Sequence, residues 1–108
     1  MKRSVSGLVA ATLVLASSSL WAQGVVEVSI DKYLFAPREL KIKPGTTVKW
    51  TNNEKRTSHS VLFPGEGGLE SDRMLPGESW ERKFDRPGTY AYTCGPHPEM
   101  SGVIEVAE

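Results

Sequence analysis

The chain has 108 residues, a formal net charge of zero, 39% hydrophobic residues and 24% charged residues. This length and composition fit one globular domain and exclude an enzyme with separate cofactor and substrate domains. The lack of a basic excess argues against a nucleic-acid-binding protein, because phosphate recognition needs clustered lysine and arginine. The single cysteine, Cys94, excludes an intramolecular disulfide and a four-cysteine zinc site.

Residues 1–22 have the pattern of a secretory signal peptide. Two basic residues precede an apolar run that is too short to span a bilayer, and small residues follow it. We expect cleavage after Ala22, with Ser19 as a competing site, which leaves one mature domain over residues 23–108. No cysteine lies near the cleavage site, so we expect no lipid anchor in the membrane. The pattern predicts a periplasmic protein.

The rest of the chain alternates between short patterned segments and turn signals. Four Pro-Gly dipeptides each predict a tight turn, since proline presets one turn position and glycine accepts the positive φ of the next. Apolar residues recur with a period of two, which predicts half-buried strands. In chain order they are Val26, Val28 and Ile30, then Leu40 and Ile42, Val48 and Trp50, His59, Val61 and Phe63, Tyr90, Tyr92 and Cys94, and finally Ile104 and Val106. About seven to eight such strands predict an all-β fold, a Greek-key antiparallel β-sandwich.

Cys94, His97 and Met100 form a C-x2-H-x2-M motif between the last two predicted strands. A thiolate, an imidazole and a thioether suit copper in both oxidation states, whereas structural zinc sites do not use methionine. One thiolate and two imidazoles with a weak axial thioether form the blue-copper electron-transfer arrangement. The only other histidine, His59, begins an apolar segment that a Greek-key sandwich can bring beside this loop.

Each candidate ligand also has a simpler interpretation. A lone cysteine at a strand end is usually a small buried hydrophobe, and a methionine usually fills a core. Either histidine could serve a turn or a surface loop. Taken together, the spacing and the presence of only two histidines favour metal ligation. A thiol in an oxidising compartment is also protected when it is buried or bound to a metal.

Residues 59–106 resemble the cupredoxin family of blue copper proteins, and the short motif loop is most similar to that of its amicyanin branch. The resemblance is strongest in Pro-Gly-Thr-Tyr-Ala-Tyr-Thr-Cys at residues 87–94 and Gly-Val-Ile-Glu-Val at residues 102–106. It implies a soluble one-electron carrier that cycles between Cu(I) and Cu(II). It also implies one copper ion, with the ligands His59, Cys94, His97 and Met100.

Such a carrier meets redox protein partners transiently, and the resemblance implies partners such as a c-type cytochrome or a dehydrogenase. We expect a monomer that binds neither nucleic acid nor membrane. The alternative is a copper-binding protein that buffers or delivers copper, and the same four residues would serve it. An enzyme is disfavoured, because four protein ligands leave no open position for a substrate.

Two positions depart from the family pattern. Ser60 stands where relatives commonly have an asparagine whose side chain ties the two ligand loops together, and serine has a shorter reach. Glu99 stands in a slot that is often aromatic in amicyanin-like loops and belongs to the docking surface. A carboxylate there favours a partner with basic residues around its own redox centre. The amine-dehydrogenase partner of amicyanin is therefore not carried over to this chain.

Overall fold

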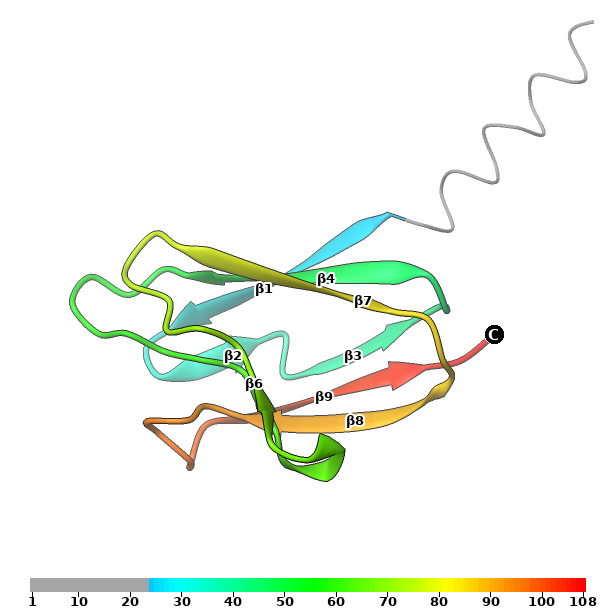
Figure 1. Cartoon of the computed structure of the whole chain (residues 1–108). Coiled ribbons are helices and arrows are strands. Elements are labelled where there is room, and N and C mark those ends of the chain that lie inside the picture. The colour runs from blue at the N-terminus through cyan, green and yellow to red at the C-terminus, as the bar shows by residue number, and fades with distance from the viewer. Residues whose placement is uncertain (1–23) are drawn as a thin grey trace, which may run out of the picture.

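The computed structural model describes residues 24–108 as two packed β-sheets (Figure 1). The predicted signal peptide lies outside the described residues. The strands are β1 (Val25–Asp31), β2 (Leu34–Ala36), β3 (Glu39–Ile42), β4 (Thr46–Asn52), β5 (Leu62–Phe63), β6 (Leu69–Glu70), β7 (Ser79–Phe84), β8 (Gly88–Thr93) and β9 (Ser101–Val106). A short 3-10 helix, η1 (Pro64–Glu66), follows β5. No helix in this part of the chain is long and apolar enough to cross a membrane.

One sheet has the strand order β2-β1-β4-β7 and the other has the order β3-β9-β8-β5-β6. The predicted all-β sandwich is confirmed, although both sheets are mixed rather than purely antiparallel. Strand β1 pairs in parallel with β4, and β3 pairs in parallel with β9. An alternating pattern reports which face of a strand is buried, not the direction of its neighbour, so the sequence did not indicate these pairs. The described residues form more strands than expected, because β2, β5 and β6 are only two or three residues long.

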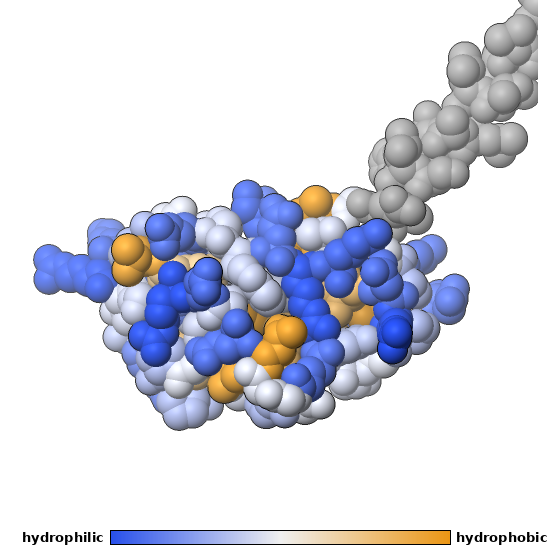
Figure 2. All heavy atoms as spheres, viewed as in Figure 1, coloured by the Kyte–Doolittle hydropathy of each residue, from blue (hydrophilic) through white to orange (hydrophobic). Residues whose placement is uncertain are grey.

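The predicted alternation matches the observed burial. The inward-facing residues that form the core include Val28, Ile30, Ile42, Val48, Trp50, Val61, Phe63, Tyr92, Ile104 and Val106. The Trp50 ring lies at the centre, with its centroid 5.4 Å from that of Tyr92 and 5.5 Å from that of Trp80. The face seen in Figure 2 is mostly polar, with small separate apolar patches. Because the interior is closely packed, the strand ends that carry the loops are held rigidly.

Three segments meet at the end of the sandwich opposite the C-terminus (Figure 1). They are the turn between β1 and β2, the segment between β4 and β5, and the loop between β8 and β9. The Tyr33 backbone N–H in the first segment donates to Glu54 Oε2 in the second, at 2.8 Å. The Gly95 backbone N–H in the third donates to Ser60 Oγ in the second, at 3.0 Å. This end carries all four predicted ligands.

Gly102 on β9 pairs with Tyr92 on β8, and a methyl group at Gly102 would collide with the Tyr92 ring. We expect Gly102→Ala to lower the free energy of unfolding of the metal-free protein by about 1–3 kcal/mol, because overpacking displaces a buried ring. Gly65→Ala is the control, since no atom lies within 4 Å of that methyl position. Urea unfolding measures both variants, and equal effects of the two would contradict the expectation.

Candidate metal centre

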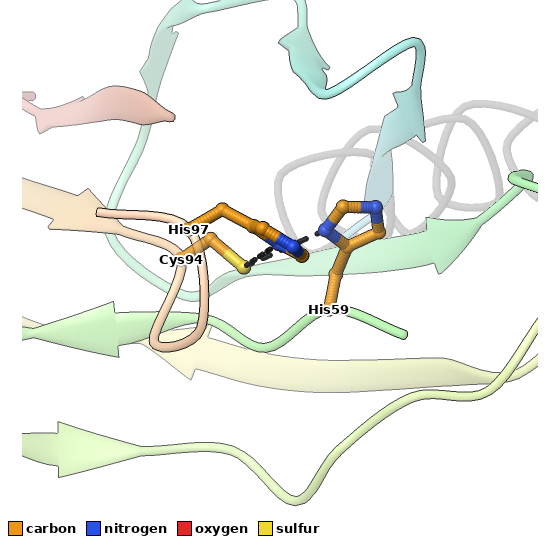
Figure 3. Close-up of side chains that lie close together, drawn as sticks. All are labelled: His59, Cys94 and His97. Carbon is orange, nitrogen blue, oxygen red and sulfur yellow. Dashed lines mark hydrogen bonds between the residues drawn. The ribbon is translucent and has the colours of Figure 1, made fainter. Parts of the chain in front are cut away.

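His59, Cys94 and His97 converge at this end of the sandwich (Figure 3). Cys94 Sγ lies 3.5 Å from His59 Nδ1 and 3.6 Å from His97 Nδ1. The ligand atoms of the three residues lie within 4.8 Å of one another. With bonds of about 2.0–2.3 Å to one ion at trigonal or tetrahedral angles, a nitrogen and a sulfur lie about 3.6–3.8 Å apart. The three donors therefore fit a single metal ion.

The loop between β8 and β9 holds Cys94 at its start and Met100 at its end, both buried. Cys94 N–H donates to the Met100 carbonyl at 3.2 Å, and Met100 N–H donates to the His97 carbonyl at 2.9 Å. Pro96 and Pro98 restrict φ on both sides of His97. The loop is thereby closed on itself, with His97 half-buried at its tip.

His59 comes from the segment that leads into β5. Its backbone exchanges hydrogen bonds with Met74, at 3.2 Å and 2.8 Å. The buried side chain of Asn52 donates to the carbonyls of Thr57 and Met74, at 2.8 Å each. Its Oδ1 accepts the Glu54 backbone N–H at 2.9 Å. One amide side chain at the end of β4 thus fixes the path of the chain to His59.

The second ring nitrogen of His59, Nε2, lies 3.1 Å from Glu54 Oε2. An acceptor there places the ring proton on Nε2 and turns the Nδ1 lone pair toward Cys94. Burial lowers the pKa of His59 although Glu54 opposes the shift, so the imidazole is neutral at neutral pH, the form that binds metals. Burial raises the pKa of Glu54, but hydrogen bonds from Tyr33 and His59 hold it below its usual value, so this carboxyl group is ionised.

Tyr33 covers the two histidines from the turn between β1 and β2. Its ring meets those of His59 and His97 edge-on, with centroids 5.4 Å and 4.9 Å apart. Lys32 and Tyr33 both have positive φ, 55° and 60°, which costs of order 1 kcal/mol for each residue that is not glycine. The hydrogen bond from Tyr33 N–H to Glu54 holds this turn in place.

Sequence reasoning missed Tyr33 and Glu54. An acidic residue shortly before the upstream histidine was a usable signal for Glu54, since ligand histidines commonly pair with carboxylates. No pattern marked Tyr33, because its position over the site depends on the two positive φ angles.

Ser60 ties the two ligand segments despite its short side chain. Its backbone N–H donates to Cys94 Sγ at 3.4 Å, and its Oγ accepts the Gly95 N–H at 3.0 Å. The same hydroxyl donates to Glu70 Oε2 at 2.7 Å. The reach suffices because Gly95 has no side chain, since a methyl group there would lie 2.7 Å from Ser60 Oγ.

Known proteins share this arrangement of sequence and fold. A family model described as copper binding proteins of the plastocyanin/azurin family matches residues 22–107. Amicyanin-alpha from Methylorubrum extorquens is 40% identical over 105 residues, covering 89% of this chain and 87% of that protein. Amicyanin from Paracoccus denitrificans is 37% identical over 89 residues, covering 79% of this chain and 67% of that protein. The structure of the Cu(I) form of an amicyanin mutant has a TM-score of 0.74 at 35% identity, covering 78% of this chain and 83% of that one.

We expect Glu54→Ala to weaken copper binding by about 10–100-fold, because a histidine that loses its outer hydrogen-bond partner is a poorer and less oriented ligand. Competition with a Cu(I) chelator measures the affinity. Glu81→Ala on β7 is the control for loss of an exposed carboxylate, and it should bind copper like the unmodified chain. Equal copper affinities for all three proteins would show that Glu54 does not support metal binding.

Proposed function

The chain belongs to the plastocyanin/azurin family of copper-binding proteins, and we propose that its one copper ion is held by His59, Cys94, His97 and Met100. The protein is a type 1 copper protein, a one-electron carrier rather than an enzyme. The observation that carries the ligand assignment is the convergence of Cys94 Sγ with His59 Nδ1 at 3.5 Å and His97 Nδ1 at 3.6 Å. The buried position of Met100, where its loop closes on Cys94, supports it as the fourth ligand.

Bound copper supplies a one-electron couple between Cu(I) and Cu(II). The protein holds the donors so that they move little when the charge of the site changes. Glu54 accepts a hydrogen bond from the second ring nitrogen of His59, and Cys94 Sγ accepts one from the Ser60 backbone N–H. His97 is held between two prolines. Donors fixed in this way keep the reorganisation energy of electron transfer low.

We propose that electrons enter and leave at the half-buried edge of His97. Tyr33 contacts the His97 ring and is 44% exposed, and the next residue, Leu34, is 63% exposed. Tyr33, Leu34, Glu99 and Met100 line one groove. A small apolar patch with a charge at its edge suits the brief, small contacts of redox partners.

We further propose that the partner is a c-type cytochrome or a dehydrogenase, and that the carrier is a periplasmic monomer formed by residues 23–108. The order of basic, apolar and small residues over residues 1–22 supports export and cleavage after Ala22. Tyr33 and Leu34 are the exposed large hydrophobic residues of this groove, and so few apolar side chains support transient partners over a permanent complex.

The Cu(II)-loaded protein is expected to show an intense thiolate-to-copper band in the visible spectrum and a narrow copper hyperfine splitting in electron paramagnetic resonance. Cys94→Ser should abolish the band, because it removes the thiolate. Met100→Leu should keep it, because the axial bond is weak. A colourless unmodified protein would contradict the ligand assignment.

Glu99 is exposed next to the His97 edge. Electron transfer to a basic c-type cytochrome is expected to slow with added salt, and Glu99→Gln should slow it severalfold at low ionic strength, because the attraction that steers the encounter is lost. Stopped-flow mixing measures the rate. Glu27→Gln on β1 should have little effect, and rates indifferent to salt and to Glu99→Gln would remove Glu99 from the docking surface.

A further inference from the structure

Glu70 lies on the edge strand β6, outside the loop that carries the metal ligands. Its carboxylate nevertheless reaches the contact between the two ligand segments. Ser60, the neighbour of His59, donates its hydroxyl proton to Glu70 Oε2 at 2.7 Å. The same hydroxyl oxygen accepts the backbone N–H of Gly95, the neighbour of Cys94, at 3.0 Å. We call the series of hydrogen bonds from Glu70 through Ser60 to Gly95 the loop clamp.

The carboxylate determines which way the Ser60 hydroxyl points. A serine hydroxyl has one proton and two lone pairs, and a carboxylate only accepts hydrogen bonds. The proton of Ser60 therefore points at Glu70, which leaves a lone pair for the Gly95 N–H. Hydrogen bonds to an ionised acceptor are short and roughly twice as strong as neutral ones. Without Glu70 the hydroxyl can rotate, and the Gly95 N–H loses its fixed acceptor.

The contact leaves little room for a side chain at position 95. A methyl group at Gly95 would collide with Glu70 Oε2 and lie 2.7 Å from Ser60 Oγ. A side chain at position 95 would therefore displace the Glu70 carboxylate and break its hydrogen bond with Ser60. The Ser60 backbone N–H that faces Cys94 Sγ at 3.4 Å belongs to the same contact.

We propose that Glu70 is a positioning residue of the copper site. Through Ser60 it holds the Cys94 loop against the His59 segment and so slows the loss of bound copper. This inference rests on the proposed ligand set. The side chain of Ser60 is short, and Glu70, which lies outside both ligand segments, holds its hydroxyl in place by accepting its proton.

Hydrogen exchange of the Gly95 amide in the metal-free protein tests the loop clamp without copper. Glu70→Ala is expected to speed this exchange about tenfold, the effect of losing one hydrogen bond. Glu70→Gln should leave it near the unmodified rate, because the amide oxygen still accepts the Ser60 proton. Glu27→Gln controls for the loss of an exposed carboxylate. The same Gly95 exchange rate in Glu70→Ala and the unmodified chain would overturn the proposal.

Copper release to an excess of chelator tests the consequence at the site. Glu70→Ala and Ser60→Ala should each release copper about tenfold faster. Their combination should be no faster than Ser60→Ala alone, because both remove the same clamp. Both Glu70 variants lose the negative charge, so faster release by Glu70→Ala than by Glu70→Gln isolates the hydrogen bond.

The two proposals fail in different ways. If the unmodified protein lacks the blue band, the ligand assignment fails, whatever the Gly95 exchange rates are. If the unmodified protein is blue but Glu70→Ala matches it in copper release, the ligand assignment stands and the role of Glu70 is overturned.

Discussion

The 3.5 Å separation of His59 Nδ1 and Cys94 Sγ is the constraint on which the site depends, because the two residues lie far apart in the sequence. Hydrogen bonds, rather than apolar packing, set this distance. Asn52 fixes the path of the backbone before His59, and Ser60 joins the His59 segment to the Cys94 loop. Both segments start from the ends of interior strands of the sandwich, β4 and β8. Buried polar groups of this kind are fully paired, so they specify one arrangement instead of weakening the core.

The charges of the site follow from the same network. His59 is neutral because it is buried, and its second nitrogen faces the ionised Glu54. A copper ion held here would bring positive charge beside the Cys94 thiolate, and Glu54 supplies a further negative group 3.1 Å from the His59 imidazole. The turn at Lys32 and Tyr33 stores backbone strain at this same end, as is common beside functional sites. A ligand that binds only the folded state also stabilises it, which matters for a small domain whose only cysteine cannot form an internal disulfide.

The sequence predicted the parts of the molecule that have a local signature. A period of two identified the buried faces of the strands, including Val48, Trp50 and Tyr92. The spacing from Cys94 to Met100 predicted a metal loop, and the scarcity of histidine pointed to His59, whose Nδ1 lies 3.5 Å from Cys94 Sγ. The parallel pairing of β1 with β4 had no such signature, because strand direction depends on how the chain crosses between sheets.

The supporting residues were the hardest part of the site to predict. Tyr33 reaches the two histidines from a turn of the other sheet, and Glu70 reaches Ser60 from the edge strand β6. The shorter reach of Ser60 raised doubt about the tie between the loops, and the close approach of Gly95 removes that doubt. Residue types that carry no sequence signature thus acquire their supporting roles at the site from tertiary contacts alone.

The protein is expected to hold its donors in place before and after copper binds. Crystal structures of the metal-free, Cu(I) and Cu(II) states test this most directly. We expect the ligand atoms of His59, Cys94 and His97 to keep their positions to within about 0.5 Å among the three states, as a preorganised site requires. An open loop in the metal-free state, with His97 or Cys94 displaced well beyond that distance, would contradict the account.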